Sequence, residues 1–162
     1  MTKSIALGGG CFWGMQELFR SQTGVVKTTA GYSGGEVLNP TYENHKGHAE
    51  VIKIDYDTQK TSFTNLLDFF FRIHNPTTLN RQGNDTDDSY RSVIFYNDEN
   101  EKSEALKFID IVNKSGRWES PVITKLEKFT FFTNAEKYHQ DYLQKNPQGY
   151  TCHFVRGESY LG

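Results

Sequence analysis

Cys11 and Cys152 are the two cysteines of this chain of 162 residues, and their thiols are its strongest candidates for chemistry. Cys11 lies between the triplet Gly8–Gly10 and the expected start of a helix at Phe12. The N–H groups and the dipole at a helix N-terminus favour a thiolate, which is the nucleophilic form of cysteine. The sequence therefore places Cys11 where nucleophiles are commonly activated. A small buried core cysteine after a strand is the alternative.

Phe12 and Trp13 follow Cys11 directly. Two large aromatic side chains beside a thiol could line an apolar pocket for a small alkyl group, but both also suit the core-facing side of an ordinary helix. The two cysteines lie near opposite ends of the chain, whereas a secreted disulfide scaffold carries more cysteines at closer spacings. They are also too few for a structural zinc site of the four-cysteine kind.

Glu50 stands at the start of an alternating segment, in which it shares parity with Ile52, Ile54 and Tyr56. If a strand begins there, the carboxyl group points to the apolar side of the sheet. Burial removes hydration and raises the pKa of a carboxyl group, and a glutamate that is protonated near neutral pH can act as a general acid. A partly exposed glutamate at a strand edge is the alternative.

Hydrophobic periodicity predicts the elements that position these residues. Helices are expected over residues 12–20, 63–74, 99–114 and 135–144, and strands over 4–7, 25–32, 50–56 and 92–96, with one or two strands within 122–132. Residues 35–47 and 75–89 are expected to form long polar loops. This order predicts an α/β (α+β) fold, a two-layer sandwich of a mixed sheet and helices with a ferredoxin-like core. We expect a single domain over residues 1–162, with an irregular tail over about 146–162.

The composition excludes several classes of protein. Hydrophobic residues make up 36% of the chain and aromatic residues 14%, which is enough apolar surface to favour a folded state. The net charge of −2 argues against a dedicated nucleic-acid-binding protein, which usually has a basic face. The apolar runs are too short to span a membrane or to form a signal peptide. We therefore expect a cytoplasmic protein, taken as a monomer, that binds neither nucleic acid nor membrane.

The segment Gly10–Gly14, with sequence GCFWG, resembles the signature of the peptide methionine sulfoxide reductase A family, which acts on the S-epimer of methionine sulfoxide. Further segments match the family in the same order: residues 30–35 (AGYSGG), 39–42 (NPTY), 47–50 (GHAE), 81–85 (RQGND), 90–92 (YRS) and 146–150 (NPQGY). The resemblance extends from about Ile5 to Cys152. Collinear matches of this number make a chance resemblance implausible.

The resemblance implies a role for each matched residue. Cys11 would attack the sulfoxide sulfur, and Glu50 would protonate the sulfoxide oxygen, which is a poor leaving group unless it is protonated. Tyr42 and Tyr90 match two tyrosines whose hydroxyl groups hold this oxygen, as donors in an oxyanion hole do. Phe12 and Trp13 would bind the methyl group. Asp85 would hold a tyrosine, a water or the bound peptide backbone, although a turn residue after Gly83 is the simpler interpretation.

The resemblance also implies how the enzyme is recycled. Attack by Cys11 leaves a sulfenic acid, which condenses with a second thiol. We expect Cys152, near the glycine Gly149, to form a disulfide with Cys11 that thioredoxin then reduces. The substrate would be methionine sulfoxide, free or in oxidised proteins, and no metal, flavin or nicotinamide cofactor would be needed. This chain has one residue more before Cys152 than a common Gly-Tyr-Cys form, and its loop at residues 43–46 is shorter than in many relatives and lacks a cysteine found there.

Other functions remain open from the residues alone. A cysteine hydrolase would pair Cys11 with a histidine base, and the candidates are His45, His48, His74, His139 and His153. A zinc site could use His45, His48 and Glu50. The glycines before Cys11 could form a phosphate-binding turn, although the lysine of a P-loop is lacking. A non-catalytic interaction module would explain neither the position of Cys11 nor the collinear matches.

Overall fold

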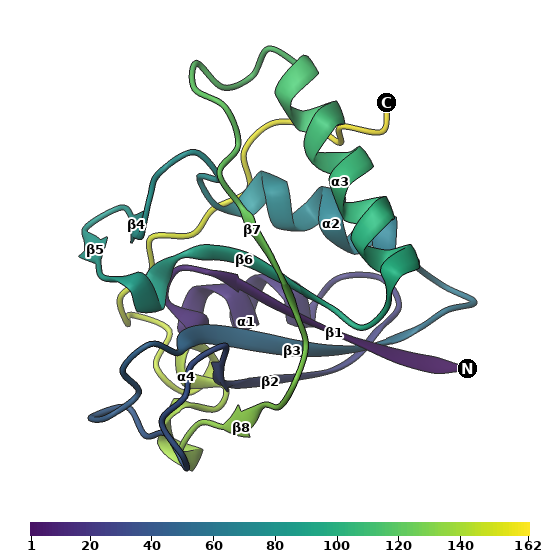
Figure 1. Ribbon diagram of the computed structural model, residues 1–162. Helices are drawn as coiled ribbons and strands as arrows, with labels where there is room; N and C mark the ends of the chain where they lie inside the picture. Colours follow the sequence, from purple (N-terminus) through teal and green to yellow (C-terminus); the bar gives the residue numbers. More distant parts are fainter.

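A six-stranded mixed sheet forms the centre of the fold in the computed structural model, which describes residues 1–162 (Figure 1). Its strand order is β7-β6-β1-β3-β2-β8. The strands are β1 (Thr2–Gly9), β2 (Val25–Ser33), β3 (Ala49–Asp57), β6 (Ser92–Tyr96), β7 (Lys125–Lys128) and β8 (Thr133–Asn134). All neighbours are antiparallel except β6 and β7. The inner order β6-β1-β3-β2, with α1 (Phe12–Arg20) after β1 and α2 (Phe63–Ile73) after β3, is the ferredoxin-like arrangement that the sequence predicts.

The two faces of the sheet are covered differently. The larger core lies between the sheet and the helices α1, α2 and α3 (Glu99–Lys114), and includes Ile52 and Ile54 of β3. The smaller core on the opposite face includes Val51 and is covered by the connection between β7 and β8, which crosses in front of the sheet in Figure 1. The expected parity of β3 is therefore confirmed, and Glu50 faces the helices. No helix is both long enough and apolar enough to cross a membrane.

Helix boundaries follow local capping signals. The Ser62 hydroxyl accepts a hydrogen bond from the N–H of Asn65 at 3.0 Å and begins α2, as expected for an N-cap serine. Asp98 begins α3 in the same way, through a 2.8 Å bond from the N–H of Glu101. The predicted helices over 12–20, 63–74 and 99–114 are confirmed within one residue.

The predicted helix over 135–144 is wrong. The chain forms a 3₁₀ turn, η2 (Lys137–His139), and a short helix, α4 (Tyr142–Lys145), separated by Asp141 with φ of 56°. The cause is tertiary: the Gln140 amide bonds both backbone groups of Ala30 on β2, at 2.9 Å and 2.8 Å. Gln140 is thus held against the sheet, which interrupts the helix.

One other expectation needs correction. The segment 75–89 is not a plain loop, because β4 (Arg81–Gln82) and β5 (Asp85–Thr86) form a hairpin around Gly83, followed by the 3₁₀ turn η1 (Asp88–Tyr90). Gly83 has φ of 56°, a conformation that favours glycine in a tight hairpin. The expectation of one or two strands within 122–132 is confirmed by β7, and β8 lies just beyond this range.

Candidate active site

Cys11 lies at the end of β1 and is the N-cap residue of α1. Gly10, with φ of 100°, makes the turn between the strand and the helix. The thiol is largely buried, and burial raises its pKa, with a further increase from the nearby Glu50 carboxylate. The backbone N–H of Trp13 acts in the opposite direction but is outweighed. The predicted lowering of the Cys11 pKa by the helix N-terminus is therefore wrong for this structure, in which Cys11 is a thiol.

Glu50 is 1% exposed and lies beside the turn that carries Cys11. Its Oε1 accepts a hydrogen bond from the N–H of Phe12 at 3.1 Å. Burial raises the pKa of this carboxyl group to about 8, although the Phe12 bond lowers it in part, and the charges of Asp85 and Asp87 raise it further. Glu50 is therefore largely protonated at pH 7, as the sequence suggests, and can donate a proton.

Trp13 is the aromatic side chain that borders the site. Its indole Nε1 donates a hydrogen bond to Nδ1 of His139 at 2.9 Å, and its ring stacks on that of Tyr142 at 3.7 Å. Phe12 is fully buried in the large core and contacts the rings of Tyr32 and His139. Phe12 is thus enclosed in the core, whereas Trp13 is only partly buried.

Tyr42 and Tyr90 come from separate segments, the loop 35–47 and the turn η1. Burial raises the pKa of both hydroxyl groups, and the negative charges of Glu50, Asp85 and Cys11 raise them further. These groups therefore lie within electrostatic reach of one another, and both phenols remain neutral donors at pH 7.

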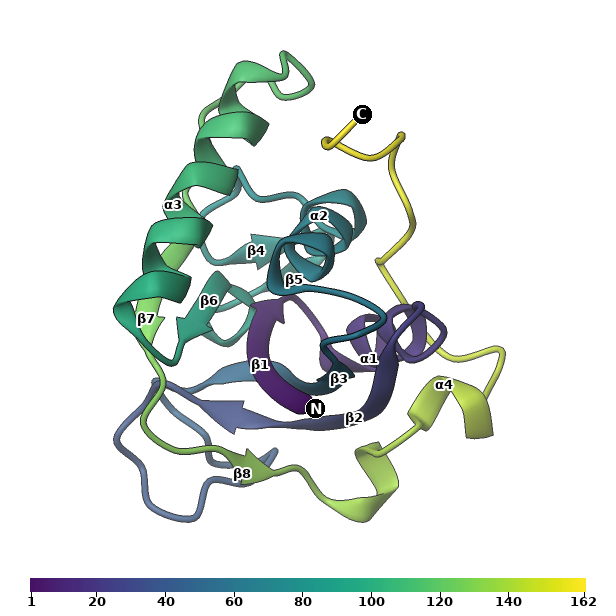
Figure 2. The same cartoon turned by 90° about the vertical axis from the view of Figure 1, so that its right-hand side faces the viewer.

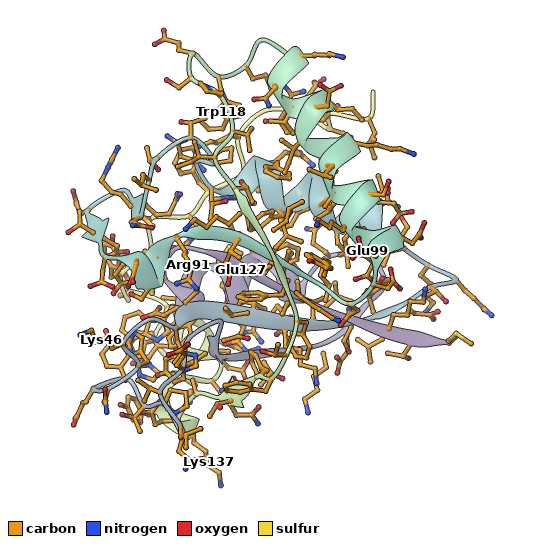
Figure 3. All side chains as sticks on the ribbon, viewed as in Figure 1. Lys46, Arg91, Glu99, Trp118, Glu127 and Lys137 are labelled. Carbon is orange, nitrogen blue, oxygen red and sulfur yellow. The ribbon has the colours of Figure 1, made fainter.

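Arg91 fixes the turn that carries Tyr90. Its Nη1 donates a hydrogen bond to the carbonyl oxygen of Asp88 at 2.9 Å, and its Nε lies 3.4 Å from Oε2 of Glu127 on β7. Figure 3 shows Arg91 and Glu127 close together beside the sheet. Arg91 thereby ties the turn η1 to strand β7.

Glu136 is a positioning residue that the sequence analysis missed. Its Oε1 accepts a hydrogen bond from the Tyr32 hydroxyl at 2.9 Å, and its Oε2 accepts one from the N–H of Tyr42 at 2.9 Å. The carboxylate thus ties the loop that carries Tyr42 to strand β2. No local signal marks this residue, because its partners lie about a hundred residues earlier in the chain.

Cys152 lies beside the β4–β5 hairpin, and the structure places it close to Asp85. Its Sγ is 3.9 Å from Oδ2 of Asp85, and the same oxygen accepts a hydrogen bond from the Tyr150 hydroxyl at 3.2 Å. Both cysteines are free thiols, and the charge of Cys152 is one of those that raise the pKa of Cys11. The tail therefore packs against the β4–β5 hairpin at Asp85 and Gly83.

The structure does not form the cysteine hydrolase site or the zinc site that the sequence leaves open. No histidine nitrogen forms a hydrogen bond with the Cys11 thiol, as a hydrolase base would. The rings of His45 and His48 bond the carbonyl oxygens of Thr41 and Val37, at 2.9 Å and 2.8 Å. Neither ring joins Glu50 in a cluster of metal-ligand type. The arrangement instead combines a thiol, a neutral acid and two phenols.

The chain is similar to known proteins over almost its whole length. The family model described as "Peptide methionine sulfoxide reductase" matches residues 3–160. The protein described as "Peptide methionine sulfoxide reductase MsrA 2" from Rhodopirellula baltica is 56% identical over 156 residues, which cover 96% of this chain and 93% of that protein.

Two solved structures of Mxr1 from Saccharomyces cerevisiae are also similar. The reduced form has a TM-score of 0.90 and 36% identity, with 96% of this chain and 93% of that chain covered. The form in complex with Trx2 has a TM-score of 0.67 and 25% identity, with 96% and 91% covered. The span matched by the family model includes every residue of the site described above.

Proposed function

The chain belongs to the peptide methionine sulfoxide reductase family, and from this premise we propose how its site reduces methionine sulfoxide. The observation that carries the proposal is the buried Glu50 carboxyl group, with a pKa of about 8, beside the turn that carries Cys11. A neutral acid and a thiol at one site are what oxygen transfer from a sulfoxide to a cysteine requires.

In the first half-reaction, the Cys11 sulfur attacks the sulfoxide sulfur while Glu50 gives its proton to the sulfoxide oxygen. Glu50 is restored by the proton of the Cys11 thiol, so one proton passes from sulfur to oxygen through the carboxyl group. The oxygen is transferred to Cys11, which leaves methionine and a sulfenic acid. Atoms and charges balance without a cofactor.

The remaining residues bind the substrate in this proposal. Tyr42 and Tyr90 donate hydrogen bonds to the sulfoxide oxygen, where their neutral phenols stabilise the developing charge. Trp13, supported by Phe12, contacts the methyl group on sulfur. Asp85 holds the Tyr150 hydroxyl, and with it the tail, at the edge of the site.

In the second half-reaction, the Cys152 thiol condenses with the sulfenic acid, which forms the Cys11–Cys152 disulfide and releases water. Thioredoxin then reduces the disulfide. The complex of the similar yeast protein with Trx2 supports this choice of partner. Cys152 is partly exposed whereas Cys11 is buried, so Cys152 is the sulfur that a protein reductant can approach.

The test is single-turnover reduction of the two separated epimers of methionine sulfoxide, with and without dithiothreitol. We expect conversion of the S-epimer alone, limited to about one turnover per protein molecule when no thiol is added. Cys11→Ser is expected to abolish conversion. Failure of the wild type to convert either epimer with dithiothreitol present would refute the assigned chemistry. The same assay with a peptide containing methionine sulfoxide compares free and protein-bound substrates.

A further inference from the structure

The side chain of His153 fastens the tail to the end of strand β1. His153 is 6% exposed, and its Nε2 lies 2.7 Å from the carbonyl oxygen of Gly9, two residues before Cys11. A carbonyl oxygen only accepts hydrogen bonds, so Nε2 must carry the proton. Burial lowers the pKa of the ring to about 4, which keeps it neutral at physiological pH. In this hydrogen bond, Nε2 of His153 is therefore the donor and the carbonyl oxygen of Gly9 is the acceptor.

Two glycines make room for this ring. A Cβ atom added at Gly14 would lie 2.3 Å from Nδ1 of His153, and one added at Gly10 would lie 3.1 Å from Nε2. The ring thus fills the space against the Gly10 turn and the first turn of α1. Gly10 and Gly14 bracket Cys11 in the sequence, so the imidazole lies directly against the segment that presents the nucleophile.

The chain around His153 is held on both sides. The His153 N–H donates a hydrogen bond to the Thr151 hydroxyl at 3.1 Å, and the Arg156 N–H donates one to the carbonyl oxygen of Arg72 on α2 at 2.7 Å. Figure 2 shows the tail running from α4 past α1 and along α2. On the other side of Cys152, the Tyr150 hydroxyl donates a hydrogen bond to Oδ2 of Asp85 at 3.2 Å. Cys152 therefore lies in a short segment with fixed ends.

Cys152 itself has weak contacts. Its sulfur lies 3.9 Å from Asp85 Oδ2 and 3.9 Å from Nδ1 of His153, both long even for a sulfur hydrogen bond. The position of this thiol is therefore set by its neighbours, and His153 makes the tail's buried bond to the strand that carries Cys11.

We propose that His153 is a positioning residue for disulfide formation: its bond to the Gly9 carbonyl holds the Cys152 thiol beside Cys11. This inference rests on the proposed role of Cys152. In the step concerned, a bond forms between the two sulfurs and the S–O bond of the Cys11 sulfenic acid breaks. The oxygen leaves as water with the sulfenic hydrogen and the Cys152 proton, so no additional reductant or oxidant takes part.

The test separates the two half-reactions. His153→Ala is mixed with one equivalent of S-epimer, and the sulfenic acid and the disulfide are followed by rapid quenching, trapping with a sulfenic-acid reagent and mass spectrometry. We expect methionine to form at the wild-type rate and the disulfide to form at least about tenfold more slowly, with sulfenic acid accumulating. His153→Gln, whose amide N–H can reach the Gly9 carbonyl, should restore most of the rate.

The controls keep the outcome interpretable. Phe154→Ala changes the exposed neighbour in the same segment and should leave disulfide formation unchanged. A wild-type rate of methionine formation shows that a variant is folded. If His153→Ala does not fold, His153→Asn, whose amide ends short of Gly9, replaces it with the same expectation.

A wild-type rate of disulfide formation in the folded Ala or Asn variant would overturn the inference, as would a Gln variant as slow as Ala. Failure of the wild type to form the Cys11–Cys152 disulfide would instead overturn the proposed role of Cys152. The two failures are thus distinguishable in the same experiment.

Discussion

Glu50 and Cys11 lie in surroundings that hold both side chains in their uncharged forms. Burial is the largest cause for each residue, and the charge of Glu50 would further disfavour a Cys11 thiolate. A protonated Glu50 removes that repulsion and, in the proposed mechanism, supplies the proton that the sulfoxide oxygen needs. At the scale of the single residue, the proposed mechanism thus gives the Glu50 carboxyl group two roles. It permits the attack by the Cys11 sulfur and assists the departure of the oxygen.

The pH dependence of the first half-reaction tests this role. The wild type should lose its acid as the pH rises through about 8, while Glu50→Gln has no acid at any pH. We expect the variant to be about 100-fold slower or more below pH 8, with the difference shrinking above it. Single-turnover rates from pH 6 to 10 measure the ratio, and a constant ratio would contradict the prediction.

The same group makes stability depend on pH. The folded pKa of Glu50 is raised from 4.5 to about 8, so the unfolded state releases this proton first as the pH rises. The stabilising contribution is therefore complete below about pH 4.5 and is lost as the pH rises to about 8. Relative to Glu50→Gln, the free energy of unfolding of the wild type should fall by a few kcal/mol between about pH 4.5 and about pH 8. Urea unfolding of both proteins at each pH measures this free energy. The same pH dependence in the wild type and in the variant would contradict the prediction.

At the scale of elements, Glu136 links β2 to the loop that carries Tyr42. Glu136→Ala should leave the Tyr32 hydroxyl without its partner and free the loop. We expect kcat/KM for methionine sulfoxide to fall about tenfold, because one donor to the oxygen is no longer held in place. Glu119→Ala, at an exposed position, is the matched control. Steady-state kinetics with dithiothreitol measures both, and equal values would refute the positioning role.

The elements that the sequence predicts well have local causes. Periodicity and an N-cap serine define α2, and alternation in β3 places Glu50 on the helix face. The elements that it misses depend on distant partners. Gln140 breaks the predicted last helix because it bonds the backbone of Ala30, and Cys152 of the tail lies against Gly83 in the hairpin.

The site divides in the same way. Cys11 and Glu50 have local signals, in a glycine turn before a helix and in the parity of a strand. Tyr42 and Tyr90 were identified only through the family resemblance, because nothing in their immediate sequence distinguishes them from the other tyrosines. Glu136 is marked neither by a local sequence signal nor by the family resemblance. Contacts between residues about a hundred positions apart produce no periodic pattern in the sequence.

At the scale of the whole molecule, the two half-reactions depend on different parts of the chain. Cys152→Ser should keep single-turnover reduction and dithiothreitol-driven turnover, because an external thiol can resolve the sulfenic acid directly. Turnover with thioredoxin and its reductase should fall to background. Assays of NADPH consumption in the coupled system measure this, and thioredoxin-driven turnover at the wild-type rate would exclude Cys152 as the resolving thiol.

The tail after Cys152 is fixed to the helical layer. The Tyr160 N–H bonds Oδ1 of Asp68 on α2 at 2.6 Å, and the Arg117 guanidinium lies over the Tyr160 ring, 4.0 Å from its centre. The Trp118 indole N–H bonds the Tyr160 hydroxyl at 3.0 Å. Tertiary contacts therefore hold in place a segment that has no regular secondary structure of its own.

Because the site joins residues that lie more than a hundred positions apart, the order of synthesis matters. The ribosome makes Cys11 well before Glu136, His139 and Cys152. A nascent chain that has formed only its first strands and helices would carry Cys11 without His139, which bonds Trp13, and without Cys152, which we propose as its disulfide partner. Oxidation of Cys11 at that stage could not be trapped within the molecule. In the proposed mechanism, Cys11 can therefore form its disulfide only after the segment that carries Cys152 has been made.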